Sequence, residues 1–180
     1  MSASSRVVIF VTSFSSSSIS KVSSSSPRKG LLAEGFEGKH IALIGTSSVE
    51  WIESYLGIIT GCATAVPLDA ALPCEELIDL INRSDSEALF LSPKHRPYLE
   101  AFLANCPKLQ KVWMLQEEVE DVPSGVYSIN ELRNTRISAS ADASCPDAKA
   151  IATIIFTSGI GAIYQVDQFF TWECSIQRHR

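Results

Sequence analysis

Several signatures of common protein classes are missing from this sequence of 180 residues. The five cysteines are odd in number and widely spaced, and they form neither a C-x-x-C pair nor a Cys/His cluster. This spacing favours free thiols in a reducing compartment over disulfides. His40, His95 and His179 also have no close partners at the spacing of metal ligands. We therefore expect no metal site and a cytoplasmic protein.

Long hydrophobic runs are also lacking. The best candidate, VVIFVTSF at residues 7–14, is far shorter than the ~20 apolar residues that cross a bilayer. The net charge of −5 gives no electrostatic reason to bind nucleic acid or an anionic membrane. The sequence therefore predicts no transmembrane segment and no nucleic-acid partner.

Acidic residues are absent from the first 30 residues, which are rich in serine. The basic residues of this stretch are Arg6, Lys21, Arg28 and Lys29. Such a composition fits the start of a secretory signal, an organelle transit peptide, or a low-complexity tail without an address. All three interpretations predict that residues 1–30 are a Ser-rich disordered leader, separate from the fold.

The rest of the chain alternates between short apolar runs and helical patterns. Hydrophobic residues make up 46% of the chain and charged residues 19%, which is enough apolar material for a packed core. Strands are predicted over 39–45, 62–69, 87–92, 111–115 and 150–156, and helices over 46–61, 72–84, 93–106 and 128–134. The strands lack an in–out alternation. This order therefore predicts an α/β fold, with a mainly parallel sheet covered by helices.

The helix predicted over 46–61 has the clearest pattern. Ser47 and Glu50 form a capping-box signature at its start, and Gly61 is placed to end it. Its predicted buried face consists of Ile52, Tyr55, Leu56 and Ile59. Trp51, within this helix, and Trp113, in the strand predicted over 111–115, are interpreted as core residues.

A candidate ligand site follows the last apolar run. An α/β sheet binds ligands at the carboxyl ends of its strands. Thr157, Ser158 and Gly159 come directly after residues 150–156 and offer two hydroxyls and consecutive backbone N–H groups, which can hold a phosphate. On spacing alone, an ordinary turn is the alternative. Lys149 is the last lysine of the chain, so no lysine follows this turn.

No catalytic residue is assigned. The chain lacks a G-x-S-x-G elbow and a G-x-G-x-x-G fingerprint. Asp69 follows a predicted strand and is interpreted as a residue that stabilises a turn. Glu75 and Glu76 suit the positive end of a helix dipole.

The order of segments over about residues 30–159 resembles the N-terminal part of the adenylate-forming (AMP-binding) ligases. The matching features are S-x-E-W at 48–51, YLGIITG at 55–61, AVPLD at 65–69, LP-x-EEL from Leu72 and ATIIFTSG at 152–159. The last of these is similar to the opening of the family's phosphate loop, [Y/F]-T-S-G-T-T-G-x-x-K-G. Within the superfamily, the acyl-CoA synthetase branch is the most similar.

This resemblance implies a chemistry. The family uses Mg²⁺ and ATP to convert a carboxylic acid to an acyl-adenylate, and a thiol, usually that of coenzyme A, then takes the acyl group. By resemblance, Thr157, Ser158 and Gly159 would hold the phosphates of ATP. The small-molecule acid, ATP and coenzyme A are therefore the expected partners of the parent enzyme.

The likeness stops after Gly159. Gln165 stands where the family pattern has its lysine, and residues 160–180 match nothing in the family. We therefore expect a partial AMP-binding α/β domain over 31–159 and an unmatched tail over 160–180. The expected function is that of a truncated carboxylate ligase, inactive as this chain and marginally soluble; the alternative is a non-catalytic α/β binding or interaction module.

Overall fold

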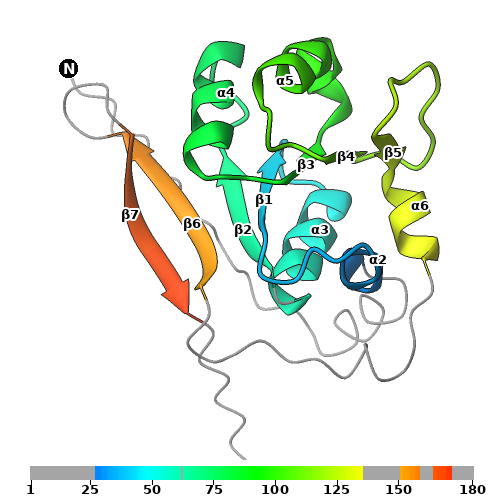
Figure 1. Cartoon of the computed structure of the whole chain (residues 1–180), viewed down its shortest axis with the longest axis horizontal. Helices are drawn as coiled ribbons and strands as arrows, with labels where there is room; N and C mark the ends of the chain where they lie inside the picture. Colours follow the sequence, from blue (N-terminus) through cyan, green and yellow to red (C-terminus); the bar gives the residue numbers. More distant parts are fainter. Residues whose placement is uncertain (1–26, 62, 136–150, 159–163, 172–180) are drawn as a thin grey trace, which may run out of the picture.

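The computed structural model describes residues 27–61, 63–135, 151–158 and 164–171. Within these ranges the chain forms one sheet with the strand order β5-β4-β3-β1-β2-β6-β7 (Figure 1). Its strands are β1 (His40–Ile44), β2 (Thr64–Leu68), β3 (Ala88–Leu91), β4 (Lys111–Met114), β5 (Val126–Ser128), β6 (Ile151–Ser158) and β7 (Tyr164–Thr171). All neighbouring pairs are parallel except β6 and β7, which are antiparallel. The predicted α/β class, with a mainly parallel sheet, is confirmed.

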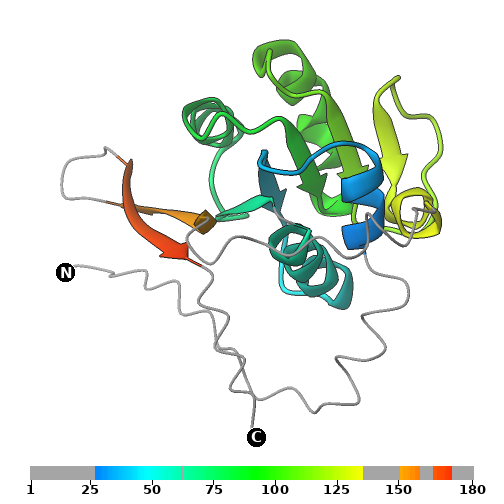
Figure 2. The same ribbon diagram turned by 60° about the horizontal axis from the view of Figure 1, so that its bottom comes forward.

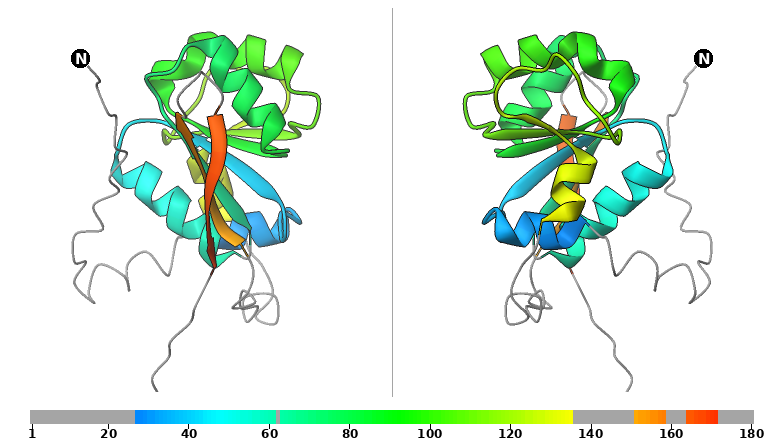
Figure 3. Two further views of the ribbon diagram at one scale, coloured as in Figure 1. Left: turned by 90° about the vertical axis from the view of Figure 1, so that its left-hand side faces the viewer. Right: turned by 90° about the vertical axis from the view of Figure 1, so that its right-hand side faces the viewer.

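Helices cover both faces of the sheet, as Figure 3 shows from two sides. One face carries α4 (Cys74–Arg83) and α5 (Leu99–Asn105), and the other carries α2 (Pro27–Ala33), α3 (Val49–Thr60) and α6 (Ile129–Asn134). In the described part of the chain, no helix is long and apolar enough to span a membrane.

The two helix layers create two cores. Along β1, Ala42 and Ile44 point into the α4–α5 core, whereas Ile41 and Leu43 point into the α2–α3 core. Successive strand residues face opposite sides, so a strand covered on both sides needs apolar residues throughout. This explains why the predicted strands show no polar alternation. Trp113 lies in the α2–α3 core at 2% exposure, as predicted, and its ring contacts Phe36 and Phe90.

The N-cap and the buried face of helix α3 differ from the predictions. Its N-cap is Ser48, whose Oγ accepts a hydrogen bond from the Trp51 backbone at 3.2 Å, so the capping box predicted at Ser47 is wrong. The predicted buried face (Ile52, Tyr55, Leu56 and Ile59) is only half-buried. The residues that are buried are Ser54, Gly57 and Ile58.

Small side chains explain why α3 buries the face with Ser54, Gly57 and Ile58 instead of the predicted one. A Cβ added at Gly57 would lie 3.0 Å from the Arg28 backbone nitrogen and 3.1 Å from the Pro27 Cβ. Helix α2 therefore packs against the side of α3 that lacks bulk, and the larger apolar side chains turn partly outward. Val49, at the start of α3, is 66% exposed, and Trp51 is half-buried against the α2–α3 core.

Other boundaries also differ from the predictions. The region 93–106 is a 3₁₀ helix, η1 (Pro93–Tyr98), followed by α5, because Pro97 lacks the N–H that an α-helix needs there. Strand β5 was not predicted. Helix α2 begins at Pro27 and buries Gly30 and Leu31, so residues 27–30, which were expected in the leader, belong to the fold. Residues 1–26 lie outside the described residues.

We predict that Gly30→Ala destabilises the fold. A Cβ at this position would lie 2.4 Å from Leu132 Cδ1 and from the Leu132 carbonyl oxygen, so α2 and α6 would have to separate. The expected loss is about 1–3 kcal/mol in the free energy of urea unfolding. The exposed Glu100→Ala, a control on α5, should change it by less than about 0.5 kcal/mol. Equal effects of the two substitutions would contradict the close packing of α2 on α6.

Candidate phosphate-binding site

The candidate phosphate residues lie at the end of β6. Thr157 and Ser158 are its last two residues, and Gly159 lies outside the described residues. Strand β6 runs parallel to β2, with Thr153 beside Ala65. Its last residues therefore lie at the same edge of the sheet as Leu68, where β2 ends. This is the carboxyl edge, at which parallel α/β sheets bind their ligands.

The strand continues two residues beyond its predicted end. Thr157 pairs with Gln165 and Ser158 with Tyr164 across the antiparallel β6–β7 hairpin (Figure 2). The prediction placed these residues in a loop because the apolar run ends at Phe156, whereas pairing with β7 keeps them in the sheet. Gln165, which stands where the resemblance has a lysine, therefore lies directly across from Thr157.

Two side-chain hydrogen bonds hold β6 on the body of the fold. The Tyr55 hydroxyl on α3 lies 2.8 Å from Thr153 Oγ1, which is only 1% exposed as a residue. Thr64 Oγ1 on β2 donates to the Ile151 carbonyl oxygen at 2.8 Å. These bonds hold the first three residues of β6 against α3 and β2.

The opposite face of β6 meets α4. Phe156 packs against the α4–α5 core, and the guanidinium carbon of Arg83 lies 5.9 Å from the centre of its ring. Arg83 is the last residue of α4 and forms an ion pair with Asp79 at 3.5 Å. A cation therefore lies beside the residue that directly precedes Thr157.

The neighbouring loop at the carboxyl edge is held by local bonds. Asp69 accepts a hydrogen bond from the Ala71 backbone at 2.9 Å, which confirms its predicted role in a turn. The buried His95 imidazole donates from Nε2 to the Ala70 carbonyl oxygen at 2.9 Å. This bond ties η1 to the loop between β2 and α4.

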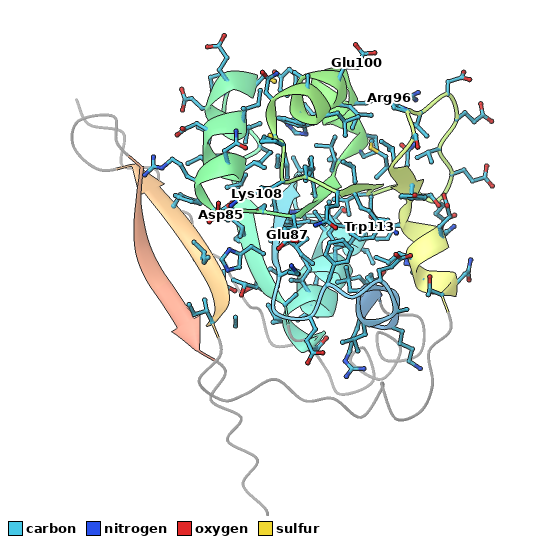
Figure 4. All side chains as sticks on the ribbon, in the orientation of Figure 1. Asp85, Glu87, Arg96, Glu100, Lys108 and Trp113 are labelled. Carbon is cyan, nitrogen blue, oxygen red and sulfur yellow. The ribbon has the colours of Figure 1, made fainter. Side chains whose placement is uncertain are left out.

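Most of the charged pairs of the described residues lie away from this edge. Lys108 pairs with Asp85 at 2.7 Å, and Lys39 pairs with Glu87 at 2.8 Å. Lys39 and Glu87 directly precede β1 and β3, and Asp85 and Lys108 come shortly before β3 and β4. These four residues therefore lie at the amino edge of the sheet, and Figure 4 labels Asp85, Glu87 and Lys108. The hydrogen bond and charge of Lys108 lower the pKa of Asp85. These exposed groups stabilise loops and do not form an acid–base pair at the candidate site.

The two described cysteines are free thiols and poor nucleophiles. Burial, with a smaller effect of Cys74, raises the pKa of the Cys106 thiol to about 11. Burial and the charge of Glu75 also raise the pKa of Cys74. Because the thiolate is the reactive form, neither side chain is prepared for nucleophilic catalysis.

The geometry thus defines a parallel α/β fold with two hydroxyl-bearing residues at its ligand edge. The family model described as "AMP-binding enzyme" matches residues 28–160. The chain therefore belongs to the family of AMP-binding enzymes. Among curated proteins, no significant match is found.

Solved structures of adenylate-forming enzymes share the fold. The anthranilate CoA ligase AuaEII is 21% identical with a TM-score of 0.63, and the match covers 79% of this chain and 27% of that one. The coronafacic acid ligase from Pectobacterium brasiliense is 22% identical with a TM-score of 0.64, and the match covers 75% of this chain and 27% of that one. A red-emitting luciferase from Phrixothrix hirtus is 16% identical with a TM-score of 0.65, and the match covers 81% of this chain and 29% of that one. This chain thus spans less than a third of each of these proteins.

We predict that Tyr55 and Thr153 are energetically coupled. Tyr55→Phe leaves the buried Thr153 hydroxyl without its partner and should cost about 1 kcal/mol in unfolding free energy. Thr153→Val should cost a similar amount, and the double variant should cost no more than about either one alone. Tyr127→Phe, on strand β5 at the other end of the strand order, serves as the control in the same urea titrations. Additive losses in the double variant would contradict the hydrogen bond.

We also predict that Cys106 resists alkylation in the folded protein. The raised pKa and the 2% exposure leave almost no accessible thiolate at pH 8. Iodoacetamide labelling, quantified by peptide mass spectrometry, should modify the half-buried Cys74 first. Cys106 should react only in urea or as the pH approaches 11. Equal labelling rates of the two cysteines in the native protein would refute this.

Proposed function

We propose that this chain carries the N-terminal part of an ATP-dependent carboxylate ligase of the acyl-CoA synthetase type. The observation that carries the proposal is the parallel pairing of β6 with β2, because it brings Thr157 and Ser158 to the ligand edge of a family member. The substrates of the whole enzyme would be a small carboxylic acid, ATP with Mg²⁺, and coenzyme A. We further propose a cytoplasmic location, in keeping with the free thiols of Cys74 and Cys106.

The residues at this edge suit a polyphosphate. Threonine and serine are residue types whose hydroxyls can donate to phosphate oxygens, Gly159 follows them in the sequence, and the guanidinium carbon of Arg83 lies 5.9 Å from the ring centre of Phe156, the residue before Thr157. In the reaction implied by the resemblance, a carboxylate oxygen bonds to the α-phosphorus of ATP, the bond to the bridging oxygen breaks, and pyrophosphate leaves. The contribution of Thr157, Ser158 and Gly159 would be to hold the β- and γ-phosphates in position.

We propose that this chain alone does not complete the reaction. It spans about a quarter of the ligases it matches, and Gln165 replaces the lysine expected beside the phosphates. A neutral amide offers less stabilisation to the charge that develops on the phosphate oxygens. The function would therefore belong to a longer parent enzyme.

A second candidate is a non-catalytic interaction module. The half-buried apolar face of α3 and the 66% exposure of Val49 favour it, because an apolar helix face of this kind is suited to a partner protein. This candidate predicts no binding of ATP by the purified chain.

We predict that the wild-type chain shows no carboxylate-dependent ATP–pyrophosphate exchange but binds Mg·ATP weakly. Gln165→Lys should tighten this binding about tenfold, which corresponds to one added charge-assisted contact of about 1.4 kcal/mol. Gln168→Lys makes the same charge change on β7, opposite Ile155 and farther from the end of β6, and is the matched control.

Isothermal titration calorimetry and an exchange assay measure these outcomes. Equal affinity of the two lysine variants would mean that Gln165 is not beside the phosphates. Complete absence of ATP binding in all three proteins would favour the interaction module. Exchange activity above a heat-treated sample would refute the proposal that the chain is inactive.

A further inference from the structure

One side of helix α3 is apolar and lies largely outside the two cores. Val49, Ile52, Leu56 and Ile59 recur at intervals of three and four residues, so they line one side of the helix, which we call the α3 stripe. Val49 is 66% exposed and the other three are half-buried. Ile59 packs against the α2–α3 core, whereas the other three belong to neither core of the described residues. A helix surface with this spacing is suited to a second apolar segment.

The segment that precedes the fold joins it beside α3. Pro27 begins α2, and its Cβ would lie 3.1 Å from a Cβ added at Gly57. The next residue, Arg28, donates from Nε to the Thr60 carbonyl oxygen at 2.9 Å. Residues 1–26 therefore enter the fold at the C-terminal half of α3.

The length of this preceding segment allows it to reach the whole α3 stripe. Helix α3 has 12 residues and is therefore about 18 Å long. Residues 15–26 can span up to roughly 40 Å between Phe14 and Pro27. The apolar run VVIFVTSF at residues 7–14 can therefore lie beside any part of the stripe.

This run is also the most apolar sequence available to cover α3. It opens with VVIFV, the longest run of large apolar side chains in the parts of the chain outside the described ranges. Residues 136–150, by contrast, read RISASADASCPDAKA and consist mainly of small and polar residues. Covering the α3 stripe with residues 7–14 would remove apolar surface of both from water.

The charges favour the same occupant. Helix α3 carries Glu50 and Glu53 and no basic residue. Glu53 pairs with Arg133, whereas a hydrogen bond from its own backbone lowers the pKa of Glu50 and keeps it charged at neutral pH. Residues 1–26 carry basic residues only, and Arg6 directly precedes the apolar run. Two copies of α3 would instead bring acidic residues to one interface, which opposes pairing with a second copy.

We propose that residues 7–14 bind along the α3 stripe of the same chain. This inference goes beyond both candidate functions, because it requires neither a phosphate nor a partner protein. It extends to residues 7–14 what the structure shows for residues 27–30, which belong to the fold and not to a separate leader. A partner protein would then reach the α3 stripe only by displacing residues 7–14.

Hydrogen–deuterium exchange of the full chain, measured on peptides by mass spectrometry, tests this contact. Amides of residues 7–14 should exchange about tenfold more slowly than in the urea-unfolded chain, and dilution should not change this protection. A photoreactive benzoylphenylalanine in place of Phe10 should crosslink to residues 49–59 within a single chain.

Substitutions on the α3 stripe should release the segment. Leu56→Asp and Val49→Asp place a charge in the stripe, so the protection of residues 7–14 and the crosslink should both be lost. Val49→Asp also puts an acid at the start of α3, where the helix dipole favours it, so this variant should keep its stability in urea. Val119→Asp changes a half-buried valine between β4 and β5 and is the control, which should retain protection and crosslink.

Each other outcome refutes the contact. Unprotected amides in residues 7–14 of the wild type would show that the segment is not bound. Equal protection in wild type and Val49→Asp, or equal loss in Val119→Asp, would mean that it does not bind the α3 stripe. Crosslinks between two chains, or protection that falls on dilution, would identify a second copy as the occupant. Urea titration of each variant separates release of the segment from unfolding.

Discussion

The parallel pairing of β6 with β2 is the contact on which the ligand edge depends. It joins the segment 151–158 to the body of the fold, and its direction decides at which edge of the sheet Thr157 and Ser158 emerge. The hydrogen bond between Tyr55 and Thr153 reinforces it from the α3 side, and Phe156 reinforces it from the α4 side. An antiparallel arrangement would bring the same hydroxyl residues to the amino edge, among the salt bridges of Asp85 and Glu87.

The elements that the sequence predicted well are those in which one property dominates. Strands β1 and β3 are buried on both faces and read as continuous apolar runs, and Gly61 ends α3 as expected. Predictions failed where packing between elements decides the result. The face that α3 buries is set by how closely α2 approaches Gly57, and neither helix signals this alone. Similarly, β5 has only three residues and exists because β4 provides its hydrogen-bond partners.

The candidate site was partly accessible from sequence for a related reason. An apolar run that stops at small hydroxyl residues is a local pattern, so Thr157 and Ser158 could be selected without a structure. The contact between Arg83 and Phe156 could not be predicted, because on its own helix Arg83 is an ordinary basic residue of the last turn with an i,i+4 partner in Asp79. This contact arises from how α4 lies against β6, and it joins two residues that are 73 positions apart in the sequence.

The strand order also has a consequence for synthesis of the chain. The strands β5-β4-β3-β1-β2 and the helices of both layers are complete by Asn134, whereas β6 begins at Ile151 and joins the sheet outside β2. On a ribosome, the body of the domain therefore emerges before the hairpin, and its five strands can pair with one another before β6 is available. The strand bearing Thr157 and Ser158 is then added to the edge formed by β2, where Ile154 and Phe156 complete the α4–α5 core.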